Sequence, residues 1–135
     1  MDYTNLHLET IALPDNLADL LAEEACWEDD RHAPFLITVN EADTEGKSAV
    51  SYQLEFSPSA DDFEALNKSL QAAGHDPDGY GWTDYLLEHV AQQEATFGEA
   101  VREDSESETC VLYTLNQTDF WLLLREVSAA IRALA

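Results

Sequence analysis

Basic residues are scarce in this chain of 135 residues: six Lys and Arg stand against 28 Asp and Glu, so the formal net charge is −22 at pH 7. Proteins that follow a nucleic-acid backbone need clustered Lys and Arg to displace counterions, and anionic lipid headgroups repel an acidic surface. The scarcity of cations therefore predicts that the chain binds neither nucleic acid nor a membrane.

Long hydrophobic runs are missing as well. No window approaches the roughly 18 consecutive apolar residues of a membrane-spanning helix. Residues 1–30 contain no Lys or Arg with which the positive start of a secretory signal would be built. We therefore expect a protein that stays in the cytoplasm.

Cysteine occurs only twice, as Cys26 and Cys110. A reducing cytoplasm and an adequate core favour two buried thiols over a disulfide. Neither cysteine stands beside residues that would stabilise a thiolate, and the apolar surroundings of Cys110 should raise its pKa. We therefore assign no catalytic role to either residue.

Core-forming residues, by contrast, are plentiful. Hydrophobic residues make up 45% of the chain and aromatic residues 10%, which is too apolar for an acidic disordered chain. The length falls within the usual size of one domain. We therefore expect a single folded domain over residues 1–135.

The N-terminal half contains both the two-residue alternation typical of strands and the spacing of about 3.6 residues typical of helices. Loose alternation over residues 3–13 predicts a first strand, and apolar residues at helical spacing predict an acidic amphipathic helix over residues 14–29. The β-forming segments 35–39 and 50–56 predict two strands, and the polar residues 40–48 between them predict a hairpin turn.

In the C-terminal half, a helix that begins near Ser59 is expected to end at a Gly74 cap. An apolar strand over 110–115 precedes an amphipathic helix, for which Thr118 or Asp119 is the expected N-cap. The order of elements predicts an α+β domain in which a mainly antiparallel sheet packs helices against one face. The strand order is left open.

The densest turn chemistry lies at residues 74–83, which read GHDPDGYGWT. His75 and its neighbouring aspartates invite a metal-binding interpretation. The calcium-loop pattern fails, however, because Tyr80 and Leu87 occupy positions that need oxygen ligands. No other cluster has zinc spacing. We therefore expect a loop here, and neither a metal nor a cofactor.

Two aromatic residues follow in the same stretch. Trp82 opens the apolar stripe of the next helix, which favours packing in the core. Tyr80 stands between Gly79 and Gly81, off that stripe, so we expect a partly exposed ring at a loop tip. Exposed aromatic residues often anchor protein interfaces.

Motifs that carry catalysis are missing: the sequence has no glycine-rich phosphate loop that opens a helix, no Gly-x-Ser-x-Gly elbow and no His-Glu-x-x-His pair. With 28 carboxylates and four histidines some pair will meet in any fold, but the sequence selects none. We therefore expect a protein that is not an enzyme. A small hydrolase or metal-dependent enzyme remains a rival hypothesis.

The surplus of acidic residues is the strongest functional signal. A net charge of −22 on so small a domain lowers its folding stability by self-repulsion, which favours a specific role over solubility alone. Capture of a basic partner protein is such a role, since opposite potentials accelerate association. We expect the steering surface in one charged segment, with Tyr80 as a candidate anchor. The acidic residues of that segment are Glu99, Glu103, Asp104, Glu106 and Glu108.

Two stretches resemble a known family. DGYGWTDYLLEHV at 78–90 resembles the Gly-Tyr-x-Trp signature of the immunity-protein-51 family of bacterial polymorphic-toxin systems. EDSESETCVLYTLNQTDFWLLLREVSAAI at 103–131 is similar to the acidic segment, strand and C-terminal helix of those proteins. The likeness covers about residues 63–131. It departs from the family at 103–108, which is polar throughout and lacks a proline-glycine turn.

The resemblance implies an inhibitor that binds and neutralises a cognate protein toxin. It transfers no catalytic residue and no toxin contact to this chain. A nuclease is the first expectation for the target, because the substrate of a nuclease is itself a polyanion. A different acidic binding module, a nucleic-acid mimic or adaptor that binds a basic host protein, is the alternative.

Overall fold

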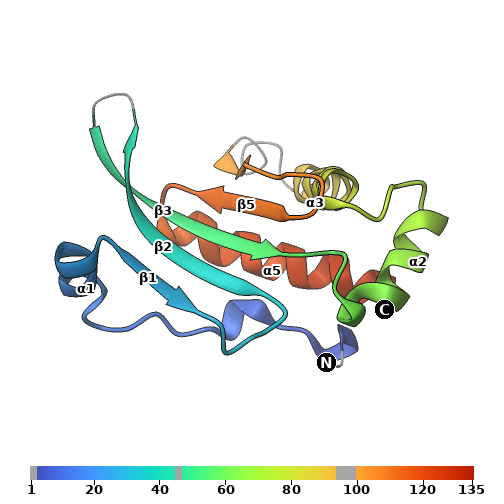
Figure 1. Ribbon diagram of the computed structural model, residues 1–135, viewed down its shortest axis with the longest axis horizontal. Coiled ribbons are helices and arrows are strands. Elements are labelled where there is room, and N and C mark those ends of the chain that lie inside the picture. The colour runs from blue at the N-terminus through green and yellow to red at the C-terminus, as the bar shows by residue number, and fades with distance from the viewer. Residues whose placement is uncertain (1–2, 45–46, 94–99) are drawn as a thin grey trace.

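The computed structural model describes residues 3–44, 47–93 and 100–135, and its strands form one antiparallel sheet in the order β1-β2-β3-β5-β4 (Figure 1). The hairpin of β2 and β3 forms its centre, and β1 and β4 are its two edges. The strands are β1 (Cys26–Asp29), β2 (Leu36–Thr44), β3 (Lys47–Phe56), β4 (Arg102–Glu103) and β5 (Cys110–Thr114).

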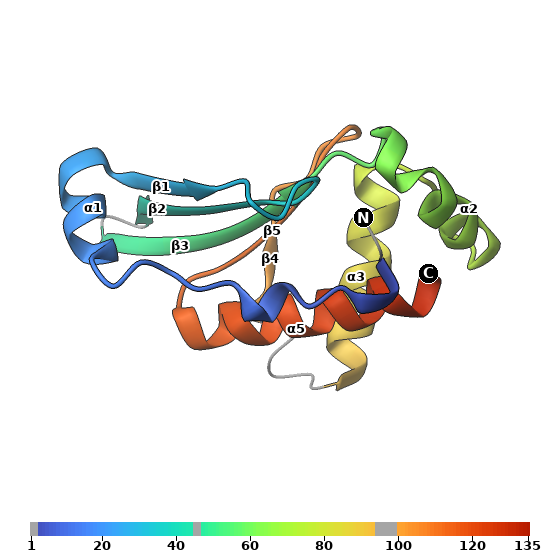
Figure 2. The same ribbon diagram turned by 90° about the horizontal axis from the view of Figure 1, so that it is seen from below.

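Helices cover one face of this sheet. α5 (Gln117–Leu134) runs along that face with α3 (Gly79–Gln93) beside it, whereas no helix of the described residues covers the opposite face (Figure 2). Two shorter helices of the described residues lie at the ends of the molecule, α1 (Leu17–Glu24) beside β1 and α2 (Glu64–Ala72) at the other end (Figure 1). The expected α+β fold, an antiparallel sheet with helices on one face, is thereby confirmed.

Alternation along β3 explains the two faces. Leu54 and Phe56 are buried in the core beneath the helices, whereas Gln53 and Glu55, at the alternate positions, are only half-buried. α5 contributes the other half of this core at helical spacing. Its large buried residues are Phe120, Leu123, Leu124, Val127 and Ile131.

An aromatic cluster fills the core at the end of β3. Phe56 and Phe63 stack with their ring centroids 5.0 Å apart, and Trp82 meets Phe56 edge-on at 5.4 Å. Trp82 is fully buried, as predicted. Its indole N–H donates to Asn67 Oδ1 at 2.8 Å, so the buried polar atom is satisfied.

The strand predicted over residues 3–13 is wrong. This segment instead forms two short 3₁₀ helices, η1 (Tyr3–Asn5) and η2 (Leu8–Thr10). A strand would need a neighbouring strand to satisfy its backbone. Here α5 supplies a partner, because the Leu8 N–H donates to Ser128 Oγ at 2.8 Å.

The predicted helix over 14–29 and the predicted turn over 40–48 are both too long. α1 ends at Glu24 because Ala25 adopts a left-handed conformation with a φ of 62°. The residues that follow form β1, which the sequence pattern missed. β2 and β3 pair as far as Thr44 and Lys47, so cross-strand pairing replaces most of the expected turn.

Helix ends differ in how well they were predicted. Gly74 follows α2 with a φ of +95°, as expected of a helix-ending glycine. The N-cap of α5 is Asn116, not Thr118 or Asp119, because Asn116 Oδ1 accepts from the Asp119 N–H at 2.8 Å. α3 begins at Gly79 and thus replaces part of the loop predicted over residues 74–83.

Of the two cysteines expected in the core, Cys110 is buried and Cys26 is exposed, and both are free thiols. The expectation for Cys26 is wrong because this residue begins the edge strand β1. Within the described parts of the chain, no helix combines the length and the apolar character needed to cross a bilayer.

Candidate functional site

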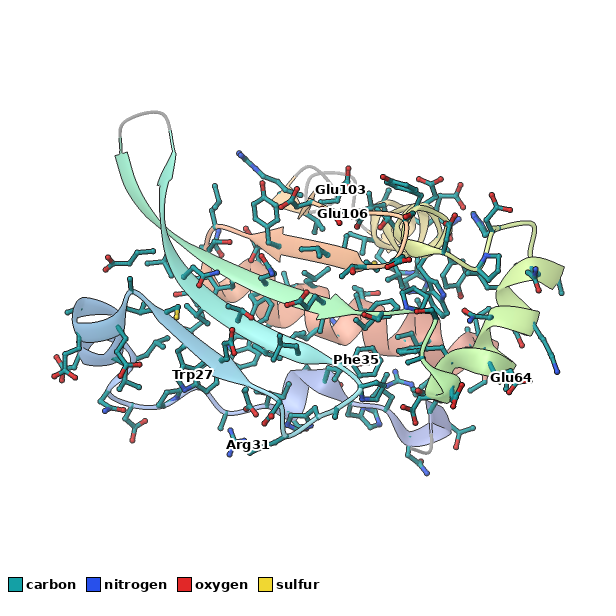
Figure 3. The ribbon with its side chains drawn as sticks, in the orientation of Figure 1. Trp27, Arg31, Phe35, Glu64, Glu103 and Glu106 are labelled. Atoms are coloured by element: carbon teal, nitrogen blue, oxygen red, sulfur yellow. The ribbon has the colours of Figure 1, made fainter. Side chains whose placement is uncertain are left out.

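Most of the predicted steering residues lie on the connection between β4 and β5. Glu103 is the last residue of β4, and Asp104, Glu106 and Glu108 follow it, all four exposed. Glu106 lies against the start of α3, where its carbonyl oxygen approaches Gly79 (Figure 3). Glu99, the remaining residue of the predicted set, lies outside the described residues.

This acidic connection is a closed hairpin. Glu106 and Thr109 exchange backbone hydrogen bonds, at 2.9 Å from the Glu106 N–H and 3.2 Å from the Thr109 N–H. Ser105 Oγ accepts from the Val111 N–H at 2.9 Å, and Glu103 Oε2 accepts from the Ser105 N–H at 2.9 Å. These bonds fix the backbone that carries the carboxylates, although the run lacks the Pro and Gly of a typical turn.

The hairpin is docked on the first turn of α3. The Gly79 N–H donates to the Ser107 carbonyl at 2.9 Å, and a Cβ at Gly79 would collide with the carbonyl oxygen of Glu106. Asp78 caps α3, because its Oδ1 accepts from the Gly81 N–H at 2.8 Å. The DGYG motif therefore brings the backbones of α3 and the hairpin together.

Tyr80 lies next to this contact and is 54% exposed, the one large hydrophobic residue of the described chain that is so open to solvent. The prediction of an exposed ring is confirmed, but the ring lies in the first turn of a helix and not at a loop tip. Since Gly79 contacts the hairpin directly, the structure brings Tyr80 and the acidic connection into one surface.

Below the hairpin, the uncovered face of the sheet is hollowed. A depression of about 280 Å³ lies between the carboxylates of Asp104 and Glu106 on one side and β3 and β5 on the other. Gln53 and Glu55 of β3 and Val111 of β5 form its floor. We call this depression, together with the hairpin, the acidic hollow.

Glu55 is the residue that sequence reasoning missed. It lies opposite Val111 in the sheet and lines both the acidic hollow and a neighbouring depression of about 250 Å³. Burial, and secondly the charge of Glu28, raise the pKa of Glu55 above its usual range. No ion pair of the described residues involves Glu55. The available signal was the alternation in β3, which sets Glu55 opposite to the buried side of the strand.

The hydroxyl and thiol side chains near the hollow, those of Thr83, Ser105 and Cys110, contact one another. Thr83 Oγ1 lies 2.6 Å from Ser105 Oγ and 3.4 Å from Cys110 Sγ, and Thr83 and Cys110 are buried. Burial raises the pKa of Cys110 to about 11, as expected for a thiol in an apolar strand. Such a thiol stays protonated at neutral pH and is a poor nucleophile.

His75 and Asp78, which the sequence suggested as possible metal ligands, both contact other groups of the protein. His75 Nε2 lies 3.4 Å from Glu88 Oε2 and Asp78 is engaged at the helix cap. Among the residues that the structure describes, no group of three or more His, Cys, Asp or Glu side chains is arranged to hold a metal ion.

No family model matches the chain, and neither a curated protein nor a solved structure matches it. A concave surface lined by three carboxylates, an amide and a valine is suited to receive a guanidinium or ammonium group.

Proposed function

We propose that this chain is an immunity protein, which binds a cognate polymorphic toxin in the cytoplasm and blocks a basic active-site cleft. The acidic hollow is the observation that carries the proposal. The exposed Tyr80 directly follows Gly79, whose N–H donates to the Ser107 carbonyl of the hairpin. The resemblance of residues 78–90 and 103–131 to the immunity-protein-51 family supports the same conclusion. The inhibitor acts by occlusion and needs no catalytic residue.

Electrostatics explains why such a surface suits an inhibitor. Attraction between a strongly acidic and a basic protein raises association rates toward about 10⁸–10⁹ M⁻¹s⁻¹ at low salt. Glu55 is half-buried and has no ion pair among the described residues, so an arginine or lysine that enters the hollow would supply a cationic partner. The same interaction that speeds the encounter therefore also strengthens the complex.

The experiment uses the toxin domain encoded by the reading frame adjacent to the gene for this chain. Co-expression of the chain should restore growth of cells that produce the toxin domain, and the purified proteins should form a stoichiometric complex. The association rate should fall as salt is added, because screening shortens the range of the attraction. Loss of growth rescue, or an association rate indifferent to salt, contradicts the proposal.

A charge-matched pair of variants localises the surface. Replacing Glu103, Asp104, Glu106 and Glu108 by their amides should slow association by about tenfold or more. The control removes four exposed carboxylates elsewhere, at Asp19, Glu23, Asp61 and Asp62. An equal loss in the control would mean that only total charge matters. Recovery of a chromosomal DNA-binding protein in place of the toxin domain would favour the nucleic-acid mimic.

A further inference from the structure

A second groove lies at the opposite edge of the sheet from the acidic hollow. Residues 12–15 and residues 27–31 enclose a space of about 670 Å³. β1 forms one wall, and no described strand pairs with its outer edge. The floor of the acidic hollow belongs to β3 and β5, whereas this groove lies beside β1, two strands away from β3.

The outer edge of β1 carries backbone hydrogen-bonding groups with which no described strand pairs. The Glu41 N–H donates to the Ala25 carbonyl at 3.0 Å, in register with the β1–β2 ladder. Peptide groups alternate in direction along an antiparallel strand, so the N–H and C=O groups of Cys26 and Glu28 point away from β2. An extended segment that enters the groove can pair with them.

The charged side chains that line the groove are mainly acidic, which favours binding of a basic segment. Arg31 is already bound to the buried carboxylate of Asp29, with Nη2–Oδ2 at 2.6 Å and Nε–Oδ1 at 2.9 Å. The guanidinium of Arg31, by this hydrogen bond, lowers the pKa of Asp29 below its usual range. Asp15, Glu28 and Asp30 also line the groove, and the described residues give none of them an ion pair.

Trp27 supplies an aromatic surface in the same groove. Its side chain is half-buried, packs against the edge of the core and lines the groove. Figure 3 shows Trp27 between β1 and the N-terminal segment, with Arg31 just beyond the end of β1. The face of an indole attracts a guanidinium or ammonium group, which adds to the attraction of the carboxylates.

From the free strand edge, the unpaired carboxylates and Trp27, we propose that this groove binds an extended basic segment of a partner protein as an additional strand on β1. A segment of about four to six residues spans the length of β1 at roughly 3.3 Å per residue. A second copy of this chain is disfavoured as the occupant, because it would bring Glu28 and Asp30 of two highly acidic molecules together. The inference does not depend on the proposed function, since it concerns another edge of the sheet.

The experiment uses a blocked seven-residue peptide in which Val and Arg alternate, titrated into the isotope-labelled full chain and followed by NMR. Saturable shifts at the amides of residues 26–30 are expected. An analogue N-methylated at alternate residues keeps its charge but cannot pair as a strand, and it should bind at least about tenfold more weakly. A Val–Glu peptide should not bind.

Two variants complete the test. Asp15→Asn with Asp30→Asn should weaken binding of the Val–Arg peptide by about threefold to tenfold. Asp61→Asn with Asp62→Asn, which precede α2 at the other end of the molecule, removes the same charge and should leave the affinity unchanged. The inference is overturned by the lack of saturable binding, by shifts centred elsewhere, by equal affinity for the N-methylated peptide, or by an equal loss in the control. In those cases the charges of β1 serve only to protect an edge strand.

Discussion

The two faces of the central sheet are built by the same strands, but one face carries buried apolar side chains and the other carries charged ones. On β3, Leu54 is buried under the helices, while its neighbour Glu55 lies on the uncovered face with a raised pKa. Burial on the first face removes apolar surface from water and stabilises the fold. Charge on the second face lowers stability in the free protein. Residues one position apart thus serve folding and, in our proposal, binding.

The largest effect is expected from shortening a side chain on the covered face. Leu54→Ala should lower the free energy of unfolding by about 3 kcal/mol, because it leaves a cavity between β3 and the helices. Gln53→Ala, one residue away on the other face, should change it by less than about 0.5 kcal/mol. Urea denaturation measures both, and similar losses would erase the distinction between the faces.

A second test concerns the contact that holds the acidic hairpin over the uncovered face. Gly79→Ala should lower the free energy of unfolding by about 2 kcal/mol, because the added Cβ collides with the backbone of Glu106 and Thr109. Tyr80→Ala, the adjacent exposed position, should change it little. Thermal unfolding compares the two variants. A silent Gly79→Ala would show that the hairpin is not held against α3.

The helix that covers the sheet can be weakened at its start. Asn116→Ala should lower the free energy of unfolding by about 1 kcal/mol, because the Asp119 N–H loses the side-chain acceptor that caps α5. Thr118→Ala, at the position expected to cap the helix, is the control and should have a smaller effect. The reverse order in chemical denaturation would contradict the observed cap.

The smallest effect has the opposite sign. A raised carboxyl pKa means that the folded protein binds the proton more tightly than the unfolded chain does. At pH values above the folded-state pKa, the charged Glu55 therefore lowers the free energy of unfolding. At pH values below the unfolded-state pKa, Glu55 is protonated in both states and has no such effect. Glu55→Gln should therefore raise the free energy of unfolding at pH 7 by a few tenths of a kcal/mol. The gain should vanish at pH 3. Urea denaturation at both pH values measures it, and a gain that persists at pH 3 would indicate a packing effect.

Sequence periodicity correctly predicted the elements that bury one continuous face, namely β3 and α5. The strict alternation at 50–56 identified β3, and the apolar period after Phe120 identified α5, because each buries one continuous face. The pattern failed at residues 3–13 and at Cys26–Asp29. In the first case α5 provides a backbone partner, and in the second a left-handed Ala25 ends a helix that the periodicity would continue.

The candidate site was predicted in part. The exposure of Tyr80 and the acidic run at 103–108 were visible in the sequence, since both depend on local pattern. Glu55 was not identified, because its importance depends on which face of the sheet the helices leave uncovered. The groove beside β1 was missed together with the strand itself.

The sequence by itself determined the acidic surplus, the α+β class and the alternation that separates Leu54 from Glu55, because composition and period are properties of the chain alone. Only the tertiary structure decided that the hairpin of residues 103–109 docks on Gly79 and lines one depression with Glu55, and that no described strand pairs with the outer edge of β1. Both depend on contacts between segments far apart in the chain. No local period encodes such contacts, since they form only when the whole core packs.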